Sequence, residues 1–174
     1  MRVLVFLALL SMSGGAIIHS IVNRPGSIAF KANLPSTSRA KVFDKLINFV
    51  WREGGGLMLV PSPVIEELGD PLSGQGCVRA IPPLYIREEI LESDGESSIV
   101  YRVVNPGWMR FYPVKEDSHR GRIELVDDGK DGVDIDWTVR WDSLYGGEAA
   151  ARMLTKVVVS SLIENLAKAL SNRV

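Results

Sequence analysis

The sequence has few of the residues that build covalent or metal-bound sites. It contains one cysteine, Cys77, and two histidines, His19 and His119, which lie far apart in the chain. A single cysteine excludes an internal disulfide and a thiolate metal cage. The two histidines form neither an HExxH motif nor a cluster. We therefore expect no metal site and no organic cofactor.

An excess of charge of one sign is also lacking. The 174 residues carry a net charge of −1, and the 24% that are charged mix both signs along the chain. No basic stripe indicates contact with nucleic acid, and there is no internal repeat or low-complexity segment. A chain of this length forms one ordinary domain that can bury a substantial core.

Residues 1–22 are the one apolar segment that suggests targeting. An early arginine precedes an apolar run over residues 3–10 and small residues up to Ala16. This is the layout of a secretory signal with a cleavage site after Gly15 or Ala16. An extension to Val22 just reaches the ~20 residues of a membrane span. The prediction is a secreted or membrane-anchored protein, and the alternative is an apolar arm that packs on a cytoplasmic domain.

The most informative segment is the last long one, residues 148–170, which has the four-residue rhythm of a helix. One row is entirely apolar: Ala150, Leu154, Val158, Leu162, Leu166 and Leu170. The rows that begin at Met153 and Thr155 are also mostly apolar. Only one row suits solvent: Arg152, Lys156, Ser160, Glu164 and Lys168. A helix with only one solvent-exposed row in four predicts a concave partner that covers the other three rows.

The domain, residues 26–174, follows a break at residues 23–26 and opens with a strand. Ser27–Leu34 alternates apolar and polar residues, as a half-buried strand does. A helix is predicted from the Ser-Thr-Ser cluster at 36–38 to about Trp51, where three glycines at 54–56 stop it. Six more strands follow, over residues 64–68, 77–81, 85–92, 98–104, 119–126 and 133–141.

The order strand, helix, about six strands and long helix predicts an α+β domain. Consecutive strands with short turns form an antiparallel meander, here curved around the C-terminal helix. Because a single sheet that closes on one helix rarely fills its concave side, we expect an internal cavity between them.

Four segments of the sequence are similar to those of one known superfamily. They are PSTSRAKVFDKLINF (35–49), GQGCVRAIP (74–82), IREEILESDGESSIVYRVVNPG (86–107) and RGRIELVDDGKDGVDIDWTVRWD (120–142). From about Ser27 to Leu170 the chain resembles the START-like polyketide cyclase/dehydrase and lipid-transport superfamily (SRPBCC), which includes the Bet v 1-like proteins and the plant abscisic acid receptors.

The resemblance implies the helix-grip fold, with a ligand cavity between the sheet and the C-terminal helix. The resemblance consists of similar segments and not of a catalytic signature. It therefore implies more about the fold than about an activity. The gate and latch motifs of the receptors and the iron–sulfur cysteines of the oxygenase branch are absent from the sequence.

The resemblance also places individual side chains on the cavity side, among them Glu88, Arg79 and His119. The set also includes Ile123 and Trp137, from the inward faces of two further strands, and Ser161, a small polar residue of the helix. The candidate ligand-binding residues are Arg79, Glu88, Tyr101, Val103, His119, Ile123, Trp137, Leu154, Val158, Ser161 and Leu162.

Glu88 and Arg79 carry the sharpest chemical hypothesis. A carboxylate that is paired with a guanidinium in a cavity stays ionised and orients a polar head group, whereas an unpaired one has its pKa raised and can act as a general base. The alternatives are a purely structural pair and an exposed Glu88. His119 is the second catalytic candidate, as a proton shuttle, against a locally hydrogen-bonded histidine at a strand start.

Other residues have both a functional and a structural interpretation. Tyr101 either donates to a ligand or fills the core. Ser161 and Asn165 either face the cavity or bond to the backbone. The apolar loop at 106–112 is a lid, a site of transient membrane contact or a segment folded on the core. Cys77 is expected to be a small core residue.

The sequence therefore predicts a protein that binds or transports a small hydrophobic ligand, such as a lipid, sterol, isoprenoid or polyketide. One alternative is a cyclase or dehydratase that uses Glu88 as acid–base, with His119 or Tyr101 as its partner. The other is a protein-interaction module that acts through the loop at 106–112. The ligand and the oligomeric state do not follow from the sequence.

Overall fold

The structure is a computed structural model that describes residues 17–57, 62–82, 86–105, 114–115, 117–144 and 146–171. Its strands are β1 (Ile17–Arg24), β2 (Ser27–Pro35), β3 (Val64–Glu67), β4 (Val78–Ile81), β5 (Ile86–Ser93), β6 (Ser98–Asn105), β7 (Arg120–Asp127) and β8 (Gly132–Arg140). Its helices are α1 (Arg39–Lys45), the π-helical η1 (Leu46–Arg52) and α2 (Glu148–Ser171).

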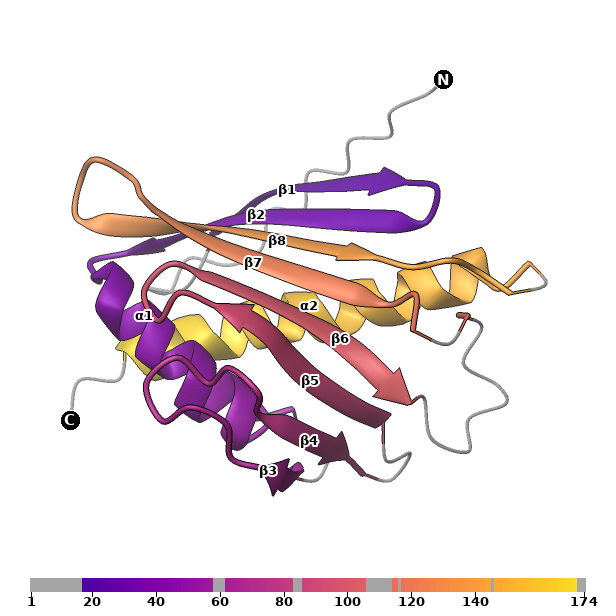
Figure 1. The fold of residues 1–174 in the computed structure, drawn as a ribbon. Helices are drawn as coiled ribbons and strands as arrows, with labels where there is room; N and C mark the ends of the chain where they lie inside the picture. The colour runs from indigo at the N-terminus through magenta and orange to yellow at the C-terminus, as the bar shows by residue number, and fades with distance from the viewer. Residues whose placement is uncertain are drawn as a thin grey trace.

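The strands form one antiparallel sheet of eight, in the order β1-β2-β8-β7-β6-β5-β4-β3. The strands from β3 to β8 each pair with the next one along the chain, so the predicted meander is confirmed. The last strand of the meander, β8, pairs with β2 over its whole length, which joins the N-terminal hairpin to the rest of the sheet (Figure 1).

Strand β1 overlaps the predicted leader, residues 1–22, from Ile17 to Val22. It pairs with β2 from Ile17↔Asn33 to Arg24↔Ser27, so the sheet begins at Ile17 and not at Ser27. A membrane span that reaches Val22 would have to remove this strand from the sheet. Residues 1–16 lie outside the described residues, and cleavage after Gly15 or Ala16 stays a prediction, which N-terminal sequencing of the cell-extracted protein would test.

The alternation of the strands gives the sheet one buried face. In β2, Ile28, Phe30, Ala32 and Leu34 are buried, and the residues between them are more exposed. In β8 the same holds for Val133, Ile135, Trp137 and Val139. Apolar side chains at every second position all point to one side of a strand, so these two neighbouring strands form the centre of the core.

The predicted helix at 36–51 is present, but its second half is a π-helix. Its apolar stripe packs on the core, with Val42, Phe43, Leu46, Ile47 and Val50 buried. Gly54, Gly55 and Gly56 then have φ values of +86°, +64° and +65°, a left-handed conformation that glycine adopts without steric cost. The prediction that the glycine triplet ends the helix is confirmed.

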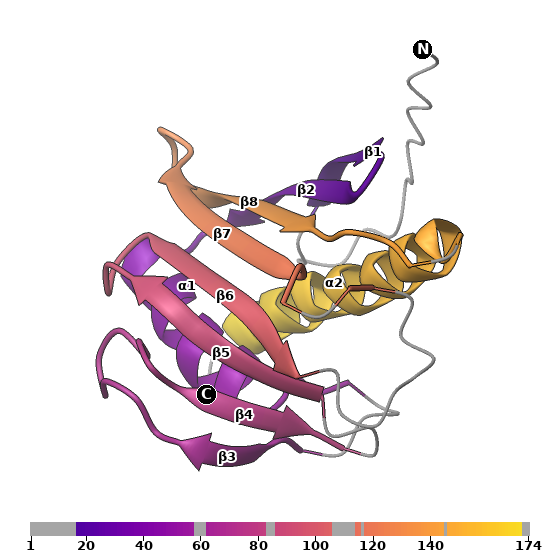
Figure 2. The same cartoon turned by 45° about the vertical axis from the view of Figure 1, so that its right-hand side comes forward.

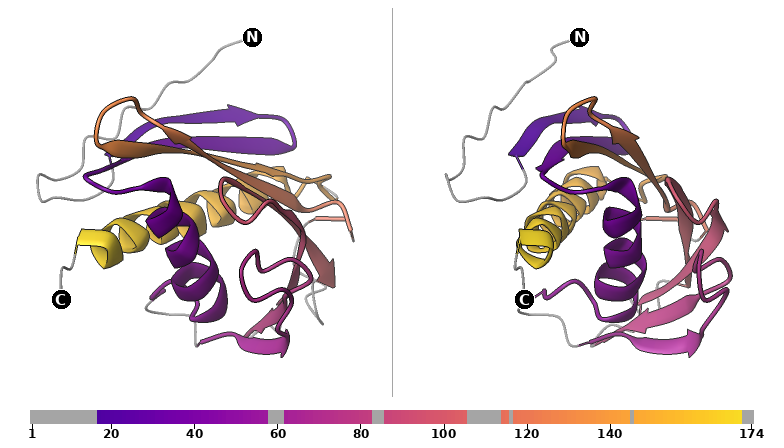
Figure 3. Two further views of the ribbon diagram at one scale, coloured as in Figure 1. Left: turned by 60° about the vertical axis from the view of Figure 1, so that its left-hand side comes forward. Right: turned by 90° about the vertical axis from the view of Figure 1, so that its left-hand side faces the viewer.

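Helix α2 runs along the concave side of the sheet, on the same side as α1 and η1 (Figure 2). Figure 3 shows the sheet curved around these helices, with one flank of α2 turned outward. The buried residues of α2 are Ala151, Thr155, Val159, Leu162, Ile163, Leu166 and Ala167.

The expectation that three of the four rows of α2 are covered is wrong. Met153 and Val157, from the second row, are 68% and 60% exposed, and Leu154 is 42% exposed. The reason is that the sheet and η1 cover only one side of the helix, so the outward flank keeps apolar residues in solvent. Among the described residues, no helix is long and apolar enough to cross a membrane.

Candidate ligand-binding cavity

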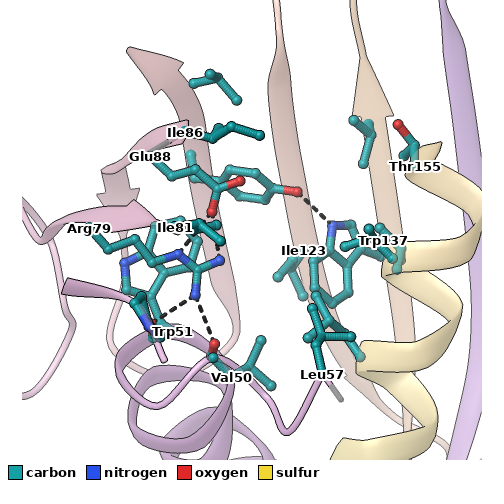
Figure 4. Close-up of a pocket in the computed structure, with 18 of the residues that line it drawn as sticks. Val50, Trp51, Leu57, Arg79, Ile81, Ile86, Glu88, Ile123, Trp137 and Thr155 are labelled. Carbon is teal, nitrogen blue, oxygen red and sulfur yellow. Dashed lines mark hydrogen bonds and ion pairs between the residues drawn. The ribbon is translucent and has the colours of Figure 1, made fainter. Parts of the chain in front are cut away.

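An internal cavity of about 200 Å³ lies between the concave face of the sheet, the C-terminal half of the α1–η1 helix and α2 (Figure 4). On the same scale one water molecule needs roughly 10–15 Å³, so the cavity has room for a small organic molecule. Most of its lining is aliphatic or aromatic: Leu46, Val50, Trp51, Leu57, Pro63, Ile81, Pro82, Ile86, Ile99, Val103, Ile123, Trp137, Val139, Leu154, Val158, Val159 and Leu162. Such a lining suits an apolar ligand.

Arg79 is the most deeply buried charged group of the lining, at 6% exposure. Its Nη1 donates to the backbone oxygens of Val50 and Trp51, at 2.8 and 2.7 Å. These carbonyls lie at the end of η1, where a helix leaves acceptors unsatisfied and favours a cation. The guanidinium carbon also lies 4.1 Å from the centre of the Trp51 ring, a cation–π contact that compensates part of the lost hydration.

Glu88 faces Arg79 from the neighbouring strand, because the two residues are register partners in the β4–β5 pair. Its Oε2 accepts from Nε and Nη2 of Arg79, at 2.9 and 2.6 Å. Among the described residues none donates to the second oxygen, Oε1, and Glu88 lines the cavity. Glu88 is therefore half of a buried ion pair and also lines the cavity, so the alternative of an exposed Glu88 is wrong, and its role toward a ligand stays a prediction.

His119 lines the same cavity just before β7. Its backbone oxygen accepts from the Val103 amide at 3.0 Å, and its ring contacts Trp141 edge-on. Burial lowers the pKa of the imidazole below its ordinary value of 6.5, and the nearby Glu88 carboxylate offsets this only in part. His119 is therefore neutral at pH 7.

Tyr101 lines the cavity and is buried. Its oxygen accepts a hydrogen bond from Nε1 of Trp137 at 3.1 Å, and its ring meets the rings of Trp51 and Trp137 edge-on. The ring lies on Gly121, its partner in the β6–β7 register. A Cβ at position 121 would overlap the Tyr101 ring, so the position of the ring depends on this glycine.

The structure brings ten of the eleven candidate ligand-binding residues to the cavity; Ser161 is half-buried outside the lining. Asn165, its neighbour in the same row, bonds to the backbone, because its Nδ2 donates to the oxygens of Gly55 and Gly56, at 2.9 and 3.1 Å. Cys77 is 1% exposed, as expected of a core residue, and burial raises the pKa of its thiol.

The wall that η1 and the following loop supply was not predicted from the sequence. Leu46 and Val50 belong to the apolar stripe of the predicted helix and Trp51 to its end, and none of the three is among the candidate ligand-binding residues. The apolar residues on both sides of the glycine triplet gave the signal that could have placed this turn against the ligand. The loop with Trp108, Met109 and Phe111 lies outside the described residues, so its predicted role as a lid, membrane contact or interaction site stays a prediction.

Within the described part of the chain, no group of three His, Cys, Asp or Glu side chains could hold a metal ion. The lining residues whose side chains carry polar groups are Arg79, Glu88, His119, Tyr101 and Thr155, together with the indoles of Trp51 and Trp137. These groups can orient a polar group of a ligand in an otherwise apolar cavity.

No model of a known protein family matches the sequence, and no curated protein matches it. Solved structures do match. The norcoclaurine synthase of Thalictrum flavum, in complex with dopamine and hydroxybenzaldehyde, has a TM-score of 0.65 and 13% identity over 97% of this chain and 99% of its own. Ara h 8.0201 has a TM-score of 0.65 and 17% identity over 84% and 100%. The protein Ms6760 of Mycobacterium smegmatis has a TM-score of 0.64 and 11% identity over 91% and 99%.

These likenesses show the fold. The eight-stranded curved antiparallel sheet and the long C-terminal helix form the helix-grip fold of the Bet v 1-like proteins, as the sequence predicted. At such identities the fold is shared and the ligand is not determined.

Proposed function

We propose that this protein binds a small hydrophobic molecule in the cavity between the sheet and α2. The observation that carries the proposal is the cavity itself: an apolar space of about 200 Å³ with one buried ion pair in its wall. Burial of about 400 Å² of apolar ligand surface would contribute on the order of 10 kcal/mol before the costs of association. The ligand classes we propose are lipids, sterols, isoprenoids and polyketides.

The ion pair favours a ligand whose polar end is a neutral hydrogen-bond donor. Arg79 already donates four hydrogen bonds to Glu88, Val50 and Trp51, and a guanidinium has five N–H donors in all. A ligand carboxylate would find few free donors and would face the negative charge of Glu88. A hydroxyl group, in contrast, can donate to Oε1 of Glu88.

The first experiment tests whether the cavity binds ligand. A fluorescent long-chain alcohol is titrated into the protein and displaced by the unlabelled alcohol. Val158→Trp places a large ring in the cavity lining and should abolish binding. Val157→Trp makes the same change one residue earlier, on the outward flank of α2, and should leave binding unchanged. Equal binding by both variants would place the ligand elsewhere.

The second experiment tests the head group. The alcohol should bind the wild-type protein roughly tenfold or more tightly than the fatty acid of the same chain length, a difference of about 1.4 kcal/mol. Glu88→Gln removes the negative charge and should narrow this preference. A fatty acid that binds as well as the alcohol would refute the assignment of the head group while leaving the cavity as the binding site.

A second candidate function is a cyclase or dehydratase reaction. It is favoured by one observation, that Glu88 and a neutral His119 line the same cavity. The Arg79 pairing weighs against it, because Oε2 of Glu88 already accepts two hydrogen bonds from the guanidinium. For an enzyme, Glu88→Gln should abolish turnover of a polyketide substrate while leaving its binding nearly intact.

A further inference from the structure

Two polar side chains are buried in opposite walls of the cavity. Leaving the aromatic residues and Cys77 aside, Arg79 and Thr155 are the only polar or charged residues that are buried in the described part of the chain, and each is 6% exposed. Both line the cavity, Arg79 from β4 and Thr155 from α2 (Figure 4). A buried polar group without a hydrogen-bond partner lowers the stability of the fold, so the partners of these two residues are informative.

The two residues differ in their partners. Arg79 donates to Glu88 and to the backbone oxygens of Val50 and Trp51. A threonine in a helix often bonds to the carbonyl four residues before it, but within the described residues the Thr155 hydroxyl makes no hydrogen bond. Thr155 therefore contributes an unpaired hydroxyl to the cavity wall.

Packing of α2 does not require a hydroxyl at position 155. The other buried residues of the helix are all apolar: Ala151, Val159, Leu162, Ile163, Leu166 and Ala167. Valine has the shape of threonine with a methyl group in place of the hydroxyl, and the two have similar helix propensities. A valine would fill this position without a desolvated polar group, so the hydroxyl is accounted for by a partner inside the cavity.

The ligand group that meets Thr155 differs from the one that meets Glu88. Figure 4 shows Glu88 reaching the cavity from the sheet and Thr155 reaching it from α2. The free oxygen of the Glu88 carboxylate, Oε1, can only accept a hydrogen bond, whereas a threonine hydroxyl can donate and accept. Glu88 therefore selects a donor, and Thr155 pairs with a hydroxyl or with a carbonyl.

We propose that Thr155 is a second polar contact of the site and that the ligand carries two polar groups on an apolar body. A hydroxyl at one point donates to Glu88, and a hydroxyl or carbonyl at another point bonds to Oγ1 of Thr155. The inference rests on the proposed function and narrows it, from a lipid with one head group to a diol or a hydroxy ketone.

Two homologous series of competitors measure the second contact. 1-Alkanols and α,ω-alkanediols of increasing chain length displace the fluorescent alcohol from the wild-type protein. The affinity of the alkanols should rise steadily with length, because each methylene adds apolar surface. The affinity of the diols should pass through a maximum at the length that brings the second hydroxyl to Thr155. At other lengths this hydroxyl ends at an apolar wall and loses its hydrogen bonds to water without replacement.

Thr155→Val removes the hydroxyl and keeps the shape of the side chain. The ratio of the affinities for the best diol and for the alkanol of the same length should fall roughly tenfold, because the second ligand hydroxyl loses its partner. The maximum in the diol series should disappear. Ser161→Ala is the matched control, since it removes a hydroxyl from the same helix outside the cavity lining, and it should leave the ratio unchanged.

The thermal stability of the ligand-free protein tests for a structural role of the hydroxyl. Because the Thr155 hydroxyl has no partner among the described residues, Thr155→Val should leave the Tm unchanged or raise it. A lower Tm would show that the hydroxyl is bonded within the protein, which overturns the proposal.

The competitor series also separate this proposal from the proposed function. A diol series without a maximum, a maximum that persists in Thr155→Val, or an equal loss of diol and alkanol affinity in that variant overturns the second contact alone. Wild-type protein that binds neither the fluorescent alcohol nor any alkanol overturns the proposed function itself.

Discussion

At the scale of single residues, Gly121 and Tyr101 set the shape of the cavity together. Gly121→Ala would place a methyl group inside the Tyr101 ring, so the ring must leave its site between Trp51 and Trp137. We expect the free energy of unfolding to fall by about 1–3 kcal/mol, as overpacking of a core usually costs. Chemical denaturation measures the loss, and the affinity for the alcohol probe should change with it.

A double-mutant cycle isolates this contact. Tyr101→Ala removes the atoms that the new methyl group would meet, so Gly121→Ala should be nearly neutral in that background. If the glycine matters only through the flexibility of its backbone, the substitution will cost the same with and without the tyrosine ring, and the packing explanation is wrong.

His119 predicts an acid-sensitive step in stability. Burial lowers its pKa from the ordinary value of 6.5, so the unfolded chain binds the proton more readily than the folded protein. The contribution of the neutral ring is complete above about pH 6.5 and is lost as the pH falls below it. The free energy of unfolding of the wild type should therefore decline between about pH 6.5 and 5, and that of His119→Gln should decline less.

The Glu148 carboxylate does not interfere in this window. The pKa of Glu148 lies below its ordinary value of 4.5, because the hydroxyl of Ser143, Arg152, the amide of Gly26 and the indole of Trp141 all donate to the carboxylate and outweigh the opposing effect of burial. Its effect on stability therefore appears only at lower pH. Parallel curves for the wild type and His119→Gln between pH 5 and 6.5 would contradict the assignment to His119.

The residues of the cavity were largely predictable, and the reasons are local. Alternation fixes which side chains of a strand point inward, so Val103, Ile123 and Trp137 follow from the pattern once the concave face is assigned. The pattern does not show that Arg79 would bond to the end of η1, because that contact joins segments almost thirty residues apart. It also cannot distinguish Ser161, outside the lining, from Thr155, within it.

At the scale of elements, α2 is fixed at its start by Glu148. This carboxylate joins the β1–β2 turn through the Gly26 amide, the end of β8 through the Trp141 indole, and α2 itself through Arg152. A negative side chain in the first turn also complements the helix dipole. One residue therefore holds three elements together at the N-terminal end of α2.

We expect Glu148→Ala to loosen this end of α2. The loss of a charged acceptor from several donors should lower the free energy of unfolding by about 1–2 kcal/mol, given that the side chain is about one-third exposed. Hydrogen exchange should accelerate at residues 24–27 and in the first two turns of α2. Glu164→Ala is the control, because Glu164 is exposed on the same helix and should leave exchange there unchanged. Equal acceleration by both variants would show a general loss of helicity instead.

Two features of the elements were not predictable from local pattern. Strand β1 shares its residues with the end of an apolar leader-like segment, and either assignment satisfies its composition. Only the register with β2 distinguishes them. The outward flank of α2 is apolar like the buried flank, so the rhythm of the sequence could not show which rows the sheet covers.

At the scale of the whole molecule, the fold follows from the order of the elements, but the size of the cavity does not. The succession of hairpins and the long terminal helix leave few arrangements open, and a helix enclosed by a curved sheet is the simplest of them. The cavity volume is a small difference between the space that the sheet encloses and the side chains that fill it. It depends on the paths of η1 and the glycine turn, which no periodicity in the sequence specifies.

A ligand that binds only the folded protein must stabilise the whole domain. At a free concentration of about one hundred times Kd the gain is about 2.7 kcal/mol, which for a chain of this size raises Tm by roughly 5–10 °C. The long-chain alcohol should therefore raise the Tm of the wild type and of Val157→Trp, measured by calorimetry, and leave that of Val158→Trp unchanged. Extraction of the purified protein with organic solvent should lower the Tm if a ligand is retained, and the alcohol should restore it. An equal rise in Val158→Trp would mean that the stabilising site is not the cavity, because the ring at position 158 occupies the space that the ligand needs.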